Sequence, residues 1–384
     1  MRKVLKATLG VVLGCVVVFI VLEGLASTAL FWRTLLFHPR APLAEKGHTR
    51  YDPELGWVNT PNVALKDYYG PGLDLTTNAQ GFRGTSPVPV AVPPGMFRII
   101  CSGDSMTLGY GVRDDQTWCQ ALASLDPRLE AVNMGQGGYG VDQAYLWFRR
   151  DGARLDHQVH IFAFIVSDFN RMQSESFYDY QKPVLVVRNG SIVVTNTPVP
   201  KVGRSRPWLQ QNLPSALEKL ATFQVASRIV QPLGAQRGDL YAGGNMERSL
   251  AVFEDLRRLN AAKGSELLLL YLPLQAEWKH RGTDRWRTDL GAELRRRGFW
   301  YVDLVDELRA LPFWRTWELF IPPGAVKFVG AAGHYTVAGH EWVARDVFNH
   351  LVADPTFARK LSALAPPARP AATVDIDGRA SNPR

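Results

Sequence analysis

Three short glycine-rich or polar segments and one distant histidine carry the residues best suited to chemistry. The first segment, 103–111 (GDSMTLGYG), places Ser105 among small residues just after the apolar stretch Phe97–Cys101. If a helical turn begins at this serine, its backbone N–H groups point at whatever the hydroxyl attacks and stabilise an oxyanion. The spacing matches neither a P-loop nor a dinucleotide-binding motif. The segment therefore favours a nucleophile over a phosphate site.

The other segments supply candidate partners for this serine. Segment 133–143 (NMGQGGYGVDQ) has a glycine cluster that lets backbone N–H groups approach a ligand closely, and segment 167–171 (SDFNR) ends a third apolar stretch. Segment 333–340 (GHYTVAGH) contributes His334 and His340. A serine hydroxyl needs a base to accept its proton, and imidazole suits this task near neutral pH. We predict that His334 is the base and that His340 is structural.

Elements that could bring these segments together are visible as an alternation of patterns. Five stretches are apolar nearly throughout, and segments of helical pattern lie between and after them. The stretches are Phe97–Cys101, Leu129–Asn133, Val159–Val166, Glu266–Leu272 and Phe299–Asp303; the helical segments are Thr117–Leu125, Gln143–Asp151, Met246–Ala262, Asp284–Arg297 and Trp342–Leu351. This alternation predicts an α/β fold of three layers, α/β/α, around a parallel sheet. The carboxyl ends of such strands meet at one edge, where open α/β sheets bind ligands.

The α/β domain is predicted over residues 96–360. Residues 33–95, rich in Pro, Gly and Asn, are predicted to be an irregular juxtamembrane segment. Residues 361–384 begin near a Pro/Ala-rich stretch and end in polar residues, so a disordered tail is expected there.

An insertion interrupts the alternation over residues 172–245. Two β-branched runs flank Asn189-Gly190, which predicts a β-hairpin with a type I′ turn, and the helical segment Pro214–Val230 follows. The insertion either shapes a substrate cleft or only protects a sheet edge.

A membrane segment is predicted over residues 1–32. Basic residues precede the run Thr8–Trp32, which only Glu23 interrupts, and about 20 apolar residues suffice to cross a bilayer. The basic start predicts a cytoplasmic amino terminus and an extracytoplasmic domain. A cleaved signal peptide is the competing interpretation, because Ser27–Ala29 offers a small-residue cleavage site. The apolar residues that follow this site favour an uncleaved anchor.

Composition narrows the class of protein. The formal net charge is +8, but the basic residues are scattered, so no arm for nucleic acid is expected. The eight histidines do not cluster with carboxylates at ligand spacing, so neither a metal nor another cofactor is implied. Of three cysteines, Cys15 lies in the apolar run and Cys101 ends a strand. We interpret the cysteines as small apolar residues rather than a disulfide framework.

Segments Gly103–Ser105, Asn133–Gln143 and His334–Gly339, in this order, resemble the motifs of the SGNH/GDSL hydrolase superfamily. Segments Tyr51–Trp57 and Thr77–Gly84 are similar to the preface of its bacterial membrane-anchored members. The resemblance covers roughly residues 50–170 and 325–350 and leaves the insertion without a counterpart. It implies a flavodoxin-like three-layer fold and a bacterial inner-membrane protein with a single-pass anchor and a periplasmic domain.

The resemblance also implies a mechanism, which is hydrolysis or transfer of an ester through an acyl-Ser105 intermediate. The backbone N–H groups of Ser105 and Gly138 would form two donors of the oxyanion hole, with Asp104 and Asp168 in supporting roles. The third donor of the family is an Asn. Here Ser167 occupies that position, so its hydroxyl or Asn170 would have to replace it.

A second departure concerns the acid that orients the base. The family carries an Asp three or two residues before its histidine, where this sequence has Ala331 and Ala332. His334 is then oriented by a backbone carbonyl, by a carboxylate from elsewhere such as Glu318 or Asp168, or not at all. In a triad, loss of the acid costs about 10⁴ in turnover.

The leading hypothesis is a serine esterase acting on a glycan- or lipid-linked O-acyl ester, with membrane lipid as the other partner. An O-acyltransferase that uses the same residues, and a binding or assembly protein that lost efficient chemistry, are the alternatives.

Overall fold

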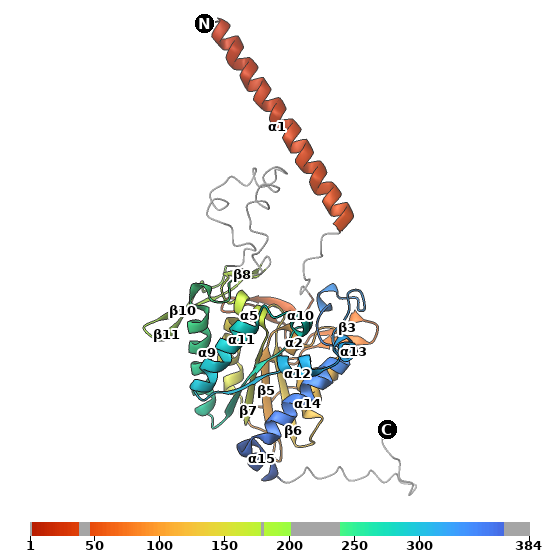
Figure 1. Ribbon diagram of the computed structural model, residues 1–384, viewed down its shortest axis with the longest axis vertical. Helices are drawn as coiled ribbons and strands as arrows, with labels where there is room; N and C mark the ends of the chain where they lie inside the picture. Colours follow the sequence, from red (N-terminus) through yellow and green to blue (C-terminus); the bar gives the residue numbers. More distant parts are fainter. Residues whose placement is uncertain (1, 38–46, 178–179, 201–238, 365–384) are drawn as a thin grey trace.

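A parallel sheet of five strands forms the centre of the computed structural model, which describes residues 2–37, 47–177, 180–200 and 239–364 (Figure 1). The strand order is β13-β12-β7-β5-β6, and every neighbouring pair is parallel. The strands are β5 Phe97–Gly103, β6 Leu129–Gly135, β7 Val159–Phe164, β12 Glu266–Tyr271 and β13 Trp300–Asp303. The predicted α/β fold with a parallel sheet is confirmed.

Alternate residues of the strands enter two different hydrophobic cores, because successive strand side chains point to opposite faces. Ile100 of β5 faces the core formed with α4 (Val141–Arg150), α9 (Asn245–Ala261) and α11 (Asp284–Arg296). Ile99 faces the other core. The helices of that second layer are α3 Trp118–Ala123, α12 Val305–Ala310, α14 Val337–Ala353 and α15 Pro355–Ser362. Helices thus cover both faces, which explains why the strands are apolar throughout.

Local capping sets the element boundaries that the sequence pattern misplaced. Helix α14 begins at Val337, because the Thr336 hydroxyl accepts a hydrogen bond from the Gly339 N–H and caps the helix. The third strand ends at Phe164, and α5 (Val166–Arg171) follows at once. The sheet therefore delivers segment 167–171 to the site on a helix.

Residues 49–76 are not irregular, and the prediction of an irregular segment was wrong there. They form two antiparallel hairpins, β1 Thr49–Asp52 with β2 Gly56–Asn59 and β3 Ala64–Gly70 with β4 Leu73–Thr76. Trp57 of β2 donates from Nε1 to the Gly137 carbonyl at 2.9 Å, and the Tyr139 hydroxyl donates to the Trp57 carbonyl. These tertiary contacts hold strands too short to show a clear period in the sequence.

The insertion contains further short strands that pack beside the site. They are β8 Ser176–Phe177, β9 Tyr180–Gln181, β10 Val184–Arg188 and β11 Ser191–Thr195. The predicted hairpin at Asn189-Gly190 is confirmed, with φ of 50° and 73° at these two residues. The fully buried Lys182 forms an ion pair with the buried Asp142 of α4, which fastens the insertion to the domain. Its predicted helix, Pro214–Val230, lies outside the described residues.

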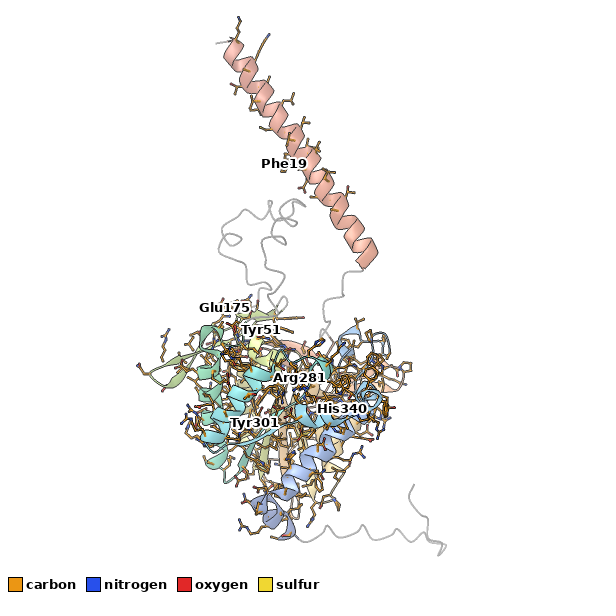
Figure 2. All side chains as sticks on the ribbon, viewed as in Figure 1. Phe19, Tyr51, Glu175, Arg281, Tyr301 and His340 are labelled. Atoms are coloured by element: carbon orange, nitrogen blue, oxygen red, sulfur yellow. A yellow bond between two sulfur atoms is a disulfide. The ribbon has the colours of Figure 1, made fainter. Side chains whose placement is uncertain are left out.

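The apolar amino-terminal segment is one long helix, α1 Arg2–Phe37, longer than the predicted 1–32. Residues Lys6–Ala29 are long and apolar enough to cross a membrane, with a mean hydropathy of 2.6, as an anchor or a signal sequence would be. Side chains along this stretch, such as Phe19, are exposed (Figure 2). At the other end, α15 extends to Ser362, past the predicted start of the tail, and residues 365–384 lie outside the described residues.

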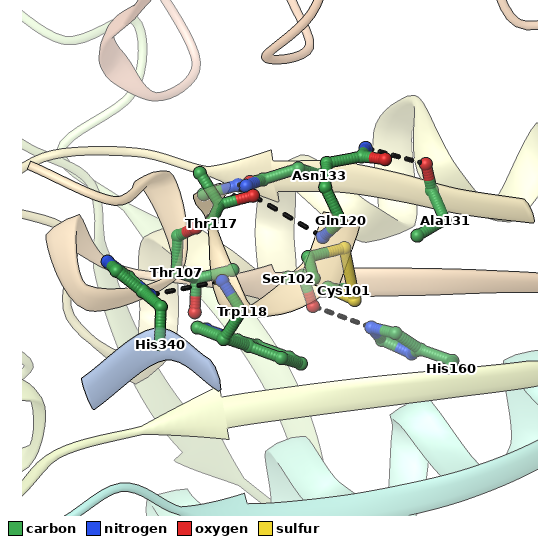
Figure 3. Close-up of a disulfide and its surroundings, with 12 residues drawn as sticks. Cys101, Ser102, Thr107, Thr117, Trp118, Gln120, Ala131, Asn133, His160 and His340 are labelled. Atoms are coloured by element: carbon green, nitrogen blue, oxygen red, sulfur yellow. Dashed lines mark hydrogen bonds between the residues drawn. A yellow bond between two sulfur atoms is a disulfide. The ribbon is translucent and has the colours of Figure 1, made fainter. Parts of the chain in front are cut away.

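Cys101 of β5 and Cys119 of α3 form a disulfide, so the interpretation of both as unpaired core residues was wrong (Figure 3). Their Cα atoms lie 6.2 Å apart. The packing of α3 against the sheet brings the two cysteines together, and no local sequence pattern indicates that they pair. Cys15 is free and exposed.

Candidate active site

Ser105 is the first residue of α2 (Ser105–Leu108), directly after the carboxyl end of β5. Asp104 caps this helix, since its Oδ1 accepts a hydrogen bond from the Met106 N–H at 2.9 Å. The helix packs tightly on the end of β6, where a Cβ on Gly135 would lie 2.0 Å from the Leu108 nitrogen. Glycine is therefore required at Gly135, and the serine is held rigidly.

His334 meets this serine across 229 positions of sequence, with its Nε2 2.8 Å from Ser105 Oγ. The histidine segment is paired with Leu319–Ile321, because the Ile321 N–H donates to the His334 carbonyl at 2.7 Å and the Gly333 N–H donates to the Ile321 carbonyl. This pairing sets the position of the imidazole. The geometry suits transfer of the serine proton to Nε2.

The other ring nitrogen of His334, Nδ1, is buried and forms no hydrogen bond of good geometry in the described part of the chain, although the backbone of Ala331 and Ala332 lies close enough to raise the pKa of the ring. Glu318 does not reach it, since this side chain is exposed and pairs with Arg315. Asp168 does not reach it either, because its carboxylate binds the Arg171 guanidinium and the Ile165 N–H. The pair is thus a serine–histidine dyad without an orienting carboxylate.

Burial lowers the pKa of His334 to about 4, because desolvation disfavours the imidazolium. The negative charge of Asp104 and the backbone of Ala331 and Ala332 raise this pKa, and the positive charge of Arg171 lowers it. The resting imidazole is consequently neutral at ordinary pH, which is the form that accepts a proton.

Arg171 links the three segments at the carboxyl edge of the sheet. Its Nη1 donates to Asp104 Oδ2 at 3.0 Å, to Asp168 Oδ1 at 2.6 Å and to the Tyr139 carbonyl at 2.9 Å. Burial and the charge of Asp104 raise the pKa of Asp168 well above its usual value. Sequence reasoning missed the role of Arg171, although its position three residues after Asp168 on a helix is a recognisable signal.

Gly138 presents its backbone close to bulky neighbours. Its φ is +75°, and a Cβ there would lie 2.6 Å from Phe177 of the insertion. The N–H groups of Ser105 and Gly138 donate no hydrogen bond to another described residue. Both are consequently available to an oxyanion.

The predicted third donor remains open between two residues on α5. Ser167 and Asn170 are both partly exposed, and no hydrogen bond in the described part of the chain joins either one to Ser105. Asn170 Oδ1 is buried without a partner. Both residues stay candidates for the third oxyanion donor.

A second serine–histidine pair lies inside the sheet, with Ser102 Oγ 2.6 Å from His160 Nε2 (Figure 3). Both residues are fully buried, and the His160 ring stacks on Phe148 with centroids 3.6 Å apart. Its other nitrogen contacts the Asn260 side chain. No substrate can reach this pair without opening the core, so we interpret it as structural.

Arg83 holds the end of α2, the helix that begins with Ser105, and sequence reasoning also missed this role. Its buried guanidinium donates to the carbonyls of Leu108, Gly109 and Val112 and pairs with Asp114. One side chain thus binds three backbone carbonyls at the end of α2 and in the loop after it, together with one carboxylate. The segment Thr77–Gly84 thus has a positional role at the site. In the described residues, no group of three or more His, Cys, Asp or Glu is placed to hold a metal.

A parallel sheet with a serine after its first strand and a histidine before the helix α14 defines an SGNH-like α/β fold. Solved structures with a similar fold include a protein assigned to the lipolytic G-D-S-L family from Desulfitobacterium hafniense, at 13% identity and a TM-score of 0.36, covering 66% of this chain and 99% of that one. The G-D-S-L family member from Veillonella parvula has 12% identity, a TM-score of 0.35 and coverage of 66% and 97%. The lipase/acylhydrolase from Enterococcus faecalis has 12% identity, a TM-score of 0.36 and coverage of 71% and 100%. No family model and no curated protein matches the sequence.

Proposed function

We propose that this chain is a membrane-anchored, extracytoplasmic serine esterase that cleaves an O-acyl ester of a glycan or lipid. The observation that carries the proposal is the 2.8 Å contact between Ser105 Oγ and His334 Nε2 at the carboxyl edge of the sheet. The free N–H groups of Ser105 and Gly138 supply the electrostatic part of the site.

The reaction proceeds in two proton-coupled steps. His334 Nε2 takes the hydroxyl proton while Ser105 Oγ attacks the acyl carbon, and the oxyanion lies against the two N–H groups. The imidazolium then returns the proton to the alkoxide that leaves, which breaks the ester and forms acyl-Ser105. Water attacks this intermediate while His334 takes a proton from it. The imidazolium returns that proton to Ser105 Oγ as the acyl–oxygen bond breaks, and the carboxylic acid and free serine are released.

The missing orienting carboxylate supports a second candidate function. Because neither Glu318 nor Asp168 reaches His334 Nδ1, its imidazolium lacks the direct stabilisation of a triad. Asp104, near the dyad, supplies a weaker substitute charge. If that charge is insufficient, the chain is a binding or assembly protein that keeps the fold.

The proposed location rests on two features. Helix α1 has the length and composition of a membrane span, and the disulfide between Cys101 and Cys119 is typical of an oxidising compartment. Both support a domain outside the cytoplasm.

Labelling with a fluorophosphonate tests the proposal. The full chain should be labelled, Ser105→Ala should abolish the label, and Ser102→Ala is the matched control that should keep it. Labelling that survives in Ser105→Ala would contradict Ser105 as the nucleophile. A folded wild-type chain with no label and no turnover of any acyl ester would contradict the esterase and favour the binding protein.

A further inference from the structure

Helix α13 (Phe313–Glu318) exposes three large aromatic side chains within five residues. Phe313, Trp314 and Trp317 are 56%, 65% and 56% exposed. The other exposed large hydrophobic side chains described in residues 47–364 are dispersed along the chain. They are Tyr51, Val90, Leu125, Tyr241, Val329 and Val352. A gathered aromatic face marks an interaction surface rather than an accident of composition. We call these three residues of α13 the aromatic face.

The aromatic face lies at the same edge of the sheet as the candidate active site. From α13 the chain passes directly into Leu319–Ile321, the segment that pairs with the backbone of His334. The ring of Phe313 contacts Trp278 of α10 (Gln275–Lys279), which follows the carboxyl end of β12, with centroids 5.6 Å apart. Whatever binds the aromatic face therefore lies beside the dyad.

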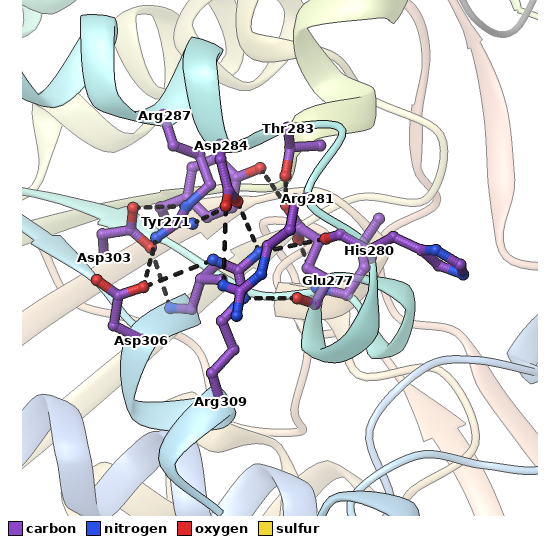
Figure 4. Close-up of polar contacts among 12 residues, drawn as sticks. Tyr271, Glu277, His280, Arg281, Thr283, Asp284, Arg287, Asp303, Asp306 and Arg309 are labelled. Atoms are coloured by element: carbon purple, nitrogen blue, oxygen red, sulfur yellow. Dashed lines mark hydrogen bonds and ion pairs between the residues drawn. The ribbon is translucent and has the colours of Figure 1, made fainter.

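A dense polar network joins α10, α11 and α12 (Figure 4). Arg309 donates from Nε to the Glu277 carbonyl at 2.8 Å and from Nη2 to Asp284 at 2.6 Å, which joins α12 to α10 and α11. Arg287 pairs with Asp303 at the end of β13. The ring contact between Phe313 and Trp278 places the aromatic face against α10, which this network joins to α11 and α12.

The membrane is within reach of this edge. Helix α1 ends at Phe37 and β1 begins at Thr49, so residues 38–48 connect them. An extended chain spans at most ~3.3–3.6 Å per residue, so the domain is tethered within roughly 40 Å of the end of α1. The β1–β2 hairpin itself contacts the Gly137 loop through Trp57. The tether therefore attaches at the edge that carries the site.

We propose that the aromatic face of α13 rests in the headgroup interface of the bilayer that anchors α1. Tryptophan and other aromatic side chains concentrate at this depth because one part of each ring is apolar and another tolerates water. The exposed Lys279 of α10 adds positive charge that anionic lipid headgroups attract, whereas Arg315 of α13 pairs with Glu318. Docked in this way, the domain holds the Ser105–His334 dyad against the membrane surface. This inference rests on the membrane anchor of the proposed function but not on the esterase activity.

The test uses a fluorophore on the full-length chain reconstituted in vesicles. In a Cys15→Ser background, Trp314→Cys provides one thiol for an environment-sensitive nitrobenzoxadiazole label. The matched control is Val352→Cys, which is 41% exposed near the end of α14. Helix α14 has 17 residues, so its end lies about 25 Å from its start beside His334.

Vesicles of phosphatidylcholine and phosphatidylglycerol with brominated acyl chains should quench the label at position 314 at least twofold more than the label at position 352. The same ratio is expected in a Ser105→Ala background, because lipid contact needs no turnover. Equal quenching at both positions overturns the proposal. So does shielding of position 314 that persists in detergent and grows with protein concentration, since a second copy of the chain would then cover the aromatic face.

Discussion

Replacing Asp104 by Asn tests how a histidine without a carboxylate on Nδ1 can hold a proton during turnover. Asp104 Oδ2 lies 3.5 Å from Ser105 Oγ, which lies 2.8 Å from His334 Nε2. An Asn oxygen can still accept the hydrogen bond from the Met106 N–H, so α2 keeps its cap. The substitution therefore removes a charge near the dyad and, with it, the ion pair between Asp104 and Arg171.

The magnitude follows from Coulomb's law. The two distances place the carboxylate within about 6.3 Å of the ring nitrogen, where unit charges interact by roughly 0.7 kcal/mol in water and about 2.6 kcal/mol at an effective dielectric constant of 20. Because His334 is charged only during the reaction, this energy stabilises the transition state. Its loss should slow turnover between about 3-fold and 80-fold. The substitution also leaves Arg171 paired with Asp168 alone, so its positive charge is less compensated and disfavours the imidazolium. The expected decrease in turnover is therefore nearer the larger value.

The assay is the pH dependence of kcat and kcat/KM on a p-nitrophenyl acyl ester. In Asp104→Asn, kcat should fall and the acid limb should move below that of the wild type, since Asp104 raises the pKa of His334. Asp126→Asn is the control, because this carboxylate pairs with Arg128 and should leave kinetics unchanged. A variant that melts like the wild type, turns over within twofold of it and keeps the same acid limb would refute the reasoning.

Three further predictions concern the base, the oxyanion hole and the disulfide. In the wild type, kcat/KM should rise with pH through an inflection near 4, where His334 loses its proton, and an inflection near 6.5 would contradict the burial argument. Gly138→Ala should lower kcat at least tenfold, because a Cβ at φ +75° meets Phe177, and unchanged kcat would exclude Gly138 from the hole. Replacing Cys101 and Cys119 by Ser removes a cross-link between residues 18 positions apart. The free energy of unfolding, measured by urea titration, should fall by roughly 3 kcal/mol. A stability equal to the wild type would mean that the pair contributes nothing to folding.

Much of the fold follows from local sequence. The apolar strands and the helical segments between them predict the layers, because a parallel sheet buried on both faces needs apolar side chains at every position. The turn at Asn189-Gly190 is equally local, since few residue pairs tolerate positive φ twice. Ser105 follows the first apolar strand, and this position indicates that it meets His334 at the carboxyl edge of the sheet.

Only the tertiary structure decides which distant groups become neighbours. The sequence shows that the side chains of Ala331 and Ala332 cannot orient His334, and the coordinates show that Glu318 and Asp168 point elsewhere. A carboxylate can come from any part of the chain, so its absence near Nδ1 has no local signature.

The same reason explains the features that sequence reasoning missed. The guanidinium groups of Arg83 and Arg171 satisfy carbonyls and carboxylates from several segments, and the pairing of Cys101 with Cys119 depends on how α3 packs against β5. Periodicity and turn propensity act over a few residues and therefore determine the elements. Hydrogen bonds, ion pairs and the disulfide join residues that only folding brings together, and they determine the site.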